Sequence, residues 1–146
     1  MGRHSSAPVG MTIVLTNRMA EIPRLSRLVS QFWTRHALPP PAENDVNLAL
    51  EEALANVIMH AYPGGGRHEI TVRLGLEPGS LTVAVEDDGV PFNPLEASQP
   101  DIQSPVEQRR VGGLGIHLVR HVMDRLEYRR EDGRNRLLMT KRLFMP

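Results

Sequence analysis

One helical stripe constrains the fold of this 146-residue chain more than any other feature. Apolar residues recur at helical spacing from Val46 to Ala61, and the stretch ends at Pro63 and three glycines. This pattern is typical of a helix that packs a broad side against a core, and proline followed by glycines ends a helix. Glu52 and Asn56 lie four residues apart, so they stand one above the other at the edge of the stripe. Such a pair is either solvated at the rim of the core or part of a functional site.

A β-rich segment, two segments in which polar and apolar residues alternate, and two segments on either side of a turn predict a sheet beside this helix. We expect strands at 11–16, 68–76, 81–87, 127–131 and 136–143, and further helices at 20–37 and 116–126. Three prolines, residues 39–41, should end the first helix and lengthen the link to the second, which Asn44 or Asp45 would cap. The order of the elements predicts an α+β fold, with three helices on one face of a mixed, mostly antiparallel sheet of about five strands.

The composition excludes several classes of function. The formal net charge is zero, which gives no electrostatic basis for binding nucleic acid or an anionic membrane. Cysteine is absent, so disulfides, thiolate metal sites and a cysteine nucleophile are excluded. No apolar run approaches the roughly 18–20 residues of a membrane-spanning helix, and residues 1–10 lack the apolar segment of a signal peptide. We therefore expect a disordered leader at 1–10 and a single cytoplasmic domain at 11–146.

Two further polar clusters lie at the ends of predicted elements. Asp87 ends a buried strand and Gly89 follows in a turn, which brings a carboxylate and bare backbone together, although turn chemistry alone also explains the pattern. Gly113 and Gly115, on either side of Leu114, open the last helix. Free amides and the helix dipole make such a terminus a phosphate site, although a plain hinge between loop and helix also fits.

The stretch from about residue 88 to 111 separates these two clusters. It is polar, contains several prolines and carries no predicted element. A structureless segment of this length inside a compact domain is more often a functional lid than a passive connector. Arg109 and Arg110 lie near its end, where a guanidinium would either reach a bound phosphate or remain solvated.

The order of the three clusters resembles the nucleotide-binding boxes of the Bergerat-fold ATPases, the superfamily of gyrase, chaperone, histidine-kinase and repair proteins. The resemblance covers roughly residues 11–143. A finer match is to the anti-sigma-factor serine/threonine kinases of bacterial partner-switching systems. Residues 60–62 read His-Ala-Tyr at the end of the first box, and residues 91–92 read Pro-Phe where other branches place a second glycine. Residues 113–119, Gly-Leu-Gly-Ile-His-Leu-Val, match the third box.

The resemblance implies a two-layer α/β sandwich and a role for each matching residue. Glu52 would be the general base that takes the proton of a serine or threonine hydroxyl, and Asn56 would bind Mg²⁺ through its amide oxygen. Asp87 would accept a hydrogen bond from the adenine amino group, and Gly89 would give the base room. The phosphates of ATP would be held by the backbone at Gly113, Leu114 and Gly115, with Arg110 near the γ-phosphate.

The resemblance also implies a function. The protein would be an ATP-dependent serine/threonine kinase that acts as an anti-sigma factor, binds a sigma factor, and phosphorylates an anti-anti-sigma partner of the STAS type, as a homodimer. An alternative is an ATP-binding module that sequesters a partner without phosphoryl transfer. The presence of both Glu52 and Asn56 favours the enzyme, because ATP binding alone requires no base. The catalytic domain of a histidine kinase is disfavoured, because no predicted helical hairpin carries a phospho-acceptor histidine.

Overall fold

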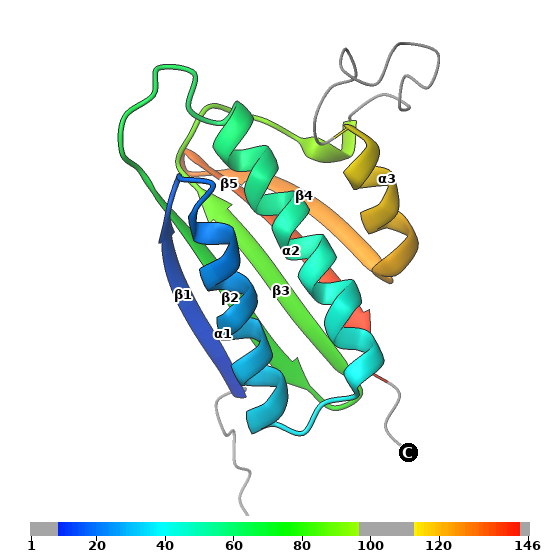
Figure 1. The fold of residues 1–146 in the computed structure, drawn as a ribbon. Helices are drawn as coiled ribbons and strands as arrows, with labels where there is room; N and C mark the ends of the chain where they lie inside the picture. The colour runs from blue at the N-terminus through cyan, green and yellow to red at the C-terminus, as the bar shows by residue number, and fades with distance from the viewer. Residues whose placement is uncertain (1–8, 97–112, 144–146) are drawn as a thin grey trace, which may run out of the picture.

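The computed structural model describes residues 9–96 and 113–143. The elements are β1 (Val9–Thr16), α1 (Glu21–Arg35), α2 (Pro40–His60), β2 (Glu69–Glu77), β3 (Ser80–Asp87), the 3-10 helix η1 (Pro94–Glu96), α3 (Gly113–Val122), β4 (Arg125–Glu131) and β5 (Arg134–Arg142). One five-stranded sheet has the order β1-β2-β3-β5-β4, and its neighbouring strands all pair antiparallel. The helices lie together on one face of this sheet (Figure 1). The α+β prediction is confirmed, with a sheet that is antiparallel rather than mixed.

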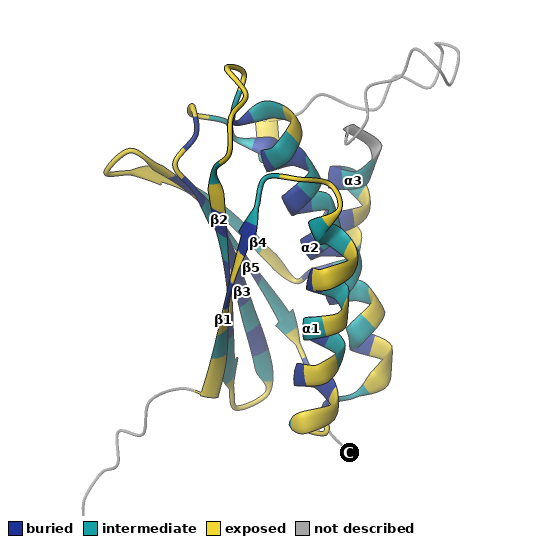
Figure 2. Ribbon diagram, turned by 60° about the vertical axis from the view of Figure 1, so that its left-hand side comes forward, coloured by how far each residue is buried: buried dark blue, intermediate teal, exposed yellow. Residues whose placement is uncertain are grey.

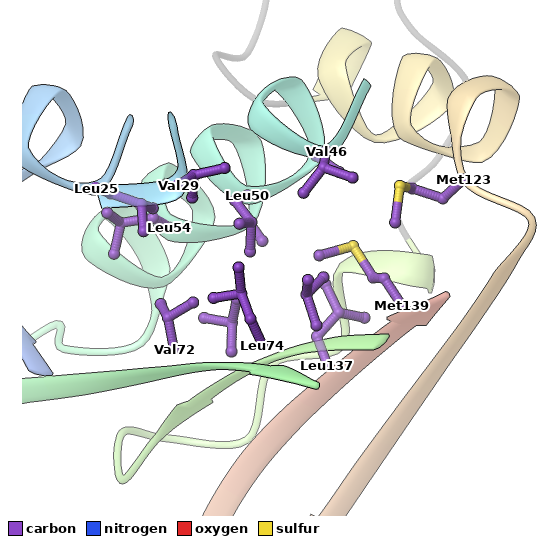
Figure 3. Packing of buried hydrophobic residues seen from close by; sticks show 14 of the residues in the cluster. Leu25, Val29, Val46, Leu50, Leu54, Val72, Leu74, Met123, Leu137 and Met139 are labelled. Carbon is purple, nitrogen blue, oxygen red and sulfur yellow. The ribbon is translucent and has the colours of Figure 1, made fainter. Parts of the chain in front are cut away.

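Buried residues lie where the sheet and the helices face each other (Figure 2), and their side chains form a hydrophobic core. In Figure 3, Leu50 and Leu54 of α2 lie above Val72 and Leu74 of β2. All four of these side chains are at most 3% exposed. The face of the sheet that turns away from the helices carries charged residues instead, such as Glu86, which pairs with two arginines. This difference between the faces explains the alternation in the sequence, because neighbouring strand residues point to opposite faces.

The start of α2 differs from the prediction. The helix begins at Pro40, so Pro40 and Pro41 lie in its first turn rather than in an extended link. Proline is suited to this place, because its fixed φ is already helical and the amide it lacks would have no partner there. Asn44 and Asp45 consequently lie inside the helix and do not cap it. Asp45 instead forms an ion pair with Lys141 of β5, with 2.9 Å between Oδ2 and Nζ.

Two strand boundaries also differ from the prediction. β1 begins at Val9, two residues inside the expected leader, while residues 1–8 lie outside the described ranges. The last hairpin has a turn of only two residues, Asp132 and Gly133, with φ of 51° and 73°. Positive φ at both turn positions matches the twist of the flanking strands, so the ladder continues to the Glu131–Arg134 pair. β5 therefore begins two residues earlier than predicted. β4 begins at Arg125, inside the range predicted for the last helix, because α3 already ends at Val122.

Candidate functional site

A pocket opens between α2, the end of β3 and the last hairpin. Its polar side chains are those of Asn56, Asp87, Tyr128 and Asn135, and its apolar walls include Phe92. The cavity between these side chains is small, about 20 Å³, and it opens to solvent. Apolar walls with a few convergent polar groups are typical of a site for a small ligand. The structure thus brings Asn56 of the first predicted cluster and Asp87 of the second into one pocket.

Asp87 is the buried carboxylate of this pocket. Its side chain is 2% exposed, and its Oδ1 accepts hydrogen bonds from the Gly89 amide and from Asn135 Nδ2, both at 2.8 Å. Burial raises the pKa of Asp87, and these two donors act in the opposite direction. A buried carboxylate with donors already in place is suited to accept one more hydrogen bond from a ligand.

Gly89 permits a close contact with the end of α2. A Cβ at Gly89 would lie 2.3 Å from the carbonyl oxygen of Ala61. The amide of the next residue, Val90, donates a hydrogen bond of 2.8 Å to the same oxygen. Gly89 is not among the residues that line the pocket. Glycine is therefore required here by the packing of the turn against the end of α2, whether or not a base lies nearby.

Glu52 contacts the first turn of α3. A Cβ at Gly115 would lie 2.0 Å from both Cδ and Oε1 of Glu52 and 2.6 Å from Oε2. Oε2 is buried and has no hydrogen-bond partner in the described part of the chain. Burial raises the pKa of Glu52, because desolvation disfavours the charged carboxylate. The first and third predicted clusters therefore meet, and they place a partly desolvated, unpaired carboxylate beside a helix N-terminus.

The remaining predicted residues are described in part. Gly113 and Leu114 belong to the first turn of α3, as expected. Arg109 and Arg110 lie outside the described residues, as does most of the predicted lid. The beginning of that lid contains η1, which was not predicted, and its Leu95 carbonyl accepts a hydrogen bond of 2.6 Å from Arg120 of α3.

Sequence reasoning missed Asn135 and Tyr128, which both line the pocket. Asn135 is 4% exposed and shares the core-facing side of β5 with Leu137 and Met139. A signal was present in the sequence, because an asparagine at a core-facing position of a strand has to satisfy its amide inside the protein. Phe92 was noted only as part of a motif, and its ring stacks on that of His60 at 4.7 Å.

Comparison with known proteins identifies the family. Residues 15–141 match the model of the histidine kinase-like ATPase domain. The chain belongs to this family. It is 32% identical over 95 residues to the serine/threonine-protein kinase BtrW of Bordetella bronchiseptica, which covers 65% of this chain and 67% of BtrW. It is 36% identical over 101 residues to the serine-protein kinase RsbW of Bacillus mycoides, which covers 66% of this chain and 62% of that protein.

A third relative and a solved structure extend the comparison. The serine-protein kinase RsbW of Listeria monocytogenes is 32% identical over 122 residues, covering 80% of this chain and 77% of that protein. The structure of the RsbU and RsbW domains of Rv1364c from Mycobacterium tuberculosis has a TM-score of 0.67 at 15% identity, and covers 94% of this chain and 33% of that one. At this identity the structural likeness shows the fold alone, and it confirms the two-layer sandwich. The chain spans about two thirds of the length of the first curated relatives that it matches.

No helix in the described ranges is long and apolar enough to cross a membrane.

Proposed function

We propose that the protein is an ATP-dependent serine/threonine protein kinase that acts as an anti-sigma factor and phosphorylates an anti-anti-sigma partner. The observation that carries this proposal is the contact between Glu52 and Gly115. It supports a general base, because Glu52 Oε2 has no hydrogen-bond partner among the residues that the structure describes and lies beside a helix terminus suited to phosphate. The relatives named serine kinases support the same reaction.

Each polar group of the site has a task in this proposal. Asp87 accepts a hydrogen bond from the adenine amino group, and the backbone at 113–115 donates to the phosphates. Glu52 takes the proton of the substrate hydroxyl while the hydroxyl oxygen attacks the γ-phosphorus of ATP and the bond between the γ-phosphorus and ADP breaks. Arg110, at the end of the predicted lid, would contact the γ-phosphate.

The donor set of the site fits Mg²⁺ and does not suit a metal bound by protein alone. Within the described ranges, no three His, Cys, Asp or Glu side chains could hold an ion together. Asn56, 5% exposed in the pocket, provides an amide oxygen of the kind that a hard cation prefers. Mg²⁺ usually takes its remaining ligands from water and nucleotide phosphates, where it neutralises the charge that develops during transfer.

The partners follow from the same proposal. A sigma factor would be bound and inhibited, and a STAS-type anti-anti-sigma protein would be the phosphorylated substrate. We propose a homodimer that acts in the cytoplasm, with no contact to nucleic acid or membrane of its own. The zero formal net charge supports the absence of direct nucleic-acid binding.

The test measures ATP binding with and without Mg²⁺, followed by phosphoryl transfer to a purified anti-anti-sigma protein. Asp87→Asn should abolish binding, and Asn56→Ala should remove the dependence on Mg²⁺. Glu52→Gln should bind ATP normally and lose transfer, with Glu51→Gln on the same helix as the matched control. Wild-type protein that binds ATP and transfers nothing to any such partner would point to a module that sequesters its partner. Wild-type protein that binds no nucleotide would refute the proposal.

A further inference from the structure

Asn135 forms the most complete hydrogen-bonding arrangement in the pocket. It lies on β5 directly opposite Asp87 of β3, in register, and its side chain is 4% exposed. Its Nδ2 donates to Asp87 Oδ1 and to the Val90 carbonyl, both at 2.8 Å. Its Oδ1 accepts from the Tyr128 hydroxyl at 2.5 Å and from the Phe92 amide at 3.3 Å. All four hydrogen-bonding positions of the amide are thus occupied.

These partners also fix the orientation of the amide. A flipped Asn135 would turn its carbonyl oxygen toward a carboxylate oxygen and the Val90 carbonyl, which are both acceptors. It would also turn its amino group toward the Phe92 amide, which is a donor. The observed orientation is therefore the one that the surroundings demand, and Nδ2 is held against Asp87.

The arrangement divides the two oxygens of Asp87 between protein and ligand. Oδ1 accepts from both Asn135 and the Gly89 amide. Both of these hydrogen bonds end at Oδ1 and neither at Oδ2, and Asp87 lines the pocket. Through Val90 and Phe92, the same asparagine ties down the turn that forms a wall of the pocket.

We propose that Asn135 is a positioning residue that sets base specificity: by holding Oδ1 of Asp87, it presents Oδ2 to a base with an exocyclic amino group. The inference rests on the proposed function, in which the pocket takes adenine. A base with an oxo group at the same place offers only lone pairs to a carboxylate and is rejected, because the buried acceptor then stays unpaired. Without the Asn135 donor, Asp87 is free to turn or to bind a proton, and the rejection weakens.

The first test compares the affinities for ATP and for inosine triphosphate, whose base carries an oxo group in place of the adenine amino group. Asn135→Leu, similar in shape but without a donor, should weaken ATP binding about tenfold to a hundredfold and reduce the preference for ATP over inosine triphosphate. Asn47→Leu is the control, because it makes the same replacement on α2 at a residue that does not line the pocket. This variant should keep the preference.

The second test needs no nucleotide. The Asp87 carboxyl is titrated by NMR in the free protein, where Asn135→Leu should raise its pKa, since a donor that lowers it is lost. The other groups that act on Asp87, namely Asp88, Arg130 and the Gly89 amide, are the same in both proteins. Asn135→Asp serves if the leucine variant does not fold. Its new carboxyl beside Asp87 should share a proton with it and add a pH-dependent step to ATP binding that the wild type lacks.

The outcomes separate the two proposals. Wild-type protein that binds no ATP would refute the proposed function, while the titration of Asp87 would still decide the role of Asn135. Wild-type protein that prefers ATP, together with an Asn135→Leu variant that keeps both this preference and the pKa of Asp87, would overturn the inference.

Discussion

Gly115→Ala should separate the chemistry of this protein from its stability. The new Cβ would lie 2.0 Å from Cδ and Oε1 of Glu52, whereas real Cβ contacts essentially never fall below 3.0 Å. The Glu52 carboxylate must therefore move away by at least about 1 Å. It is the far end of a flexible side chain, so the movement itself costs little.

The magnitudes for the two properties point in opposite directions. Replacing glycine by alanine inside a helix stabilises by about 0.5–1 kcal/mol, since the unfolded chain loses freedom. For a chain of this size, this gain corresponds to a rise in Tm of roughly 1–4 °C. Misplacing a catalytic group by about 1 Å costs on the order of 100-fold in rate, within the range of about 10²–10⁴ that a general base contributes. We expect phosphoryl transfer about 100-fold slower in a protein that is at least as stable as the wild type.

The assay combines thermal unfolding, ATP affinity and single-turnover phosphoryl transfer. A double variant, Glu52→Gln with Gly115→Ala, tests whether the new methyl group also obstructs the phosphates. If it does not, the double variant binds ATP as tightly as Glu52→Gln alone. Transfer at the wild-type rate in Gly115→Ala would refute the contact as the reason for glycine, and so would a loss of several degrees in Tm.

Three further predictions concern stability and pH. Gly89→Ala should lower the free energy of unfolding by about 1–3 kcal/mol in urea denaturation, since its Cβ would meet the Ala61 backbone, whereas Gly64→Ala, with open space around the new Cβ, should have little effect. Glu52→Gln should be more stable than the wild type at pH 7 and equal to it well below pH 4.5. The reason is that burial raises the pKa of Glu52 in the folded protein, so the stability of the wild type falls as the pH rises from 4.5 through this raised pKa. A variant less stable at pH 7 would contradict this. In calorimetric titrations, ATP affinity should decrease as the pH is lowered through the pKa of Asp87, which burial raises above its ordinary value of 3.8. An affinity unchanged down to pH 3.8 would count against Asp87 as the acceptor.

Hydrophobic period, strand propensity and turn residues together predicted all the helices and strands of the described fold apart from η1. The reason lies in the two-layer arrangement, since each strand and helix buries one side and exposes the other. Where an element begins or ends depends on local backbone chemistry instead. Pro40 and Pro41 start α2 because they fall at its first turn, and in a different register the same residues would have broken a helix.

The site was harder to predict than the fold. Glu52, Asn56 and Asp87 stood out because each is a polar residue beside an apolar pattern. Asn135 did not stand out, because its importance comes from a register that pairs it with Asp87, 48 residues earlier in the chain. Strand pairing decides which asparagine completes a buried hydrogen-bond network, and the residues on either side of that asparagine do not indicate its partner.

The two glycines of the motifs show why a glycine pattern is an incomplete guide to ligand contact. Gly89 and Gly115 both border α2, where a Cβ would strike Ala61 and Glu52 respectively. Each lets another element approach α2 at the point where the site is built, so packing within the protein is sufficient to require both. Contact with a nucleotide is a separate claim for each residue. The double variant tests it at Gly115, where the phosphates are proposed to bind, while at Gly89 it stays a prediction.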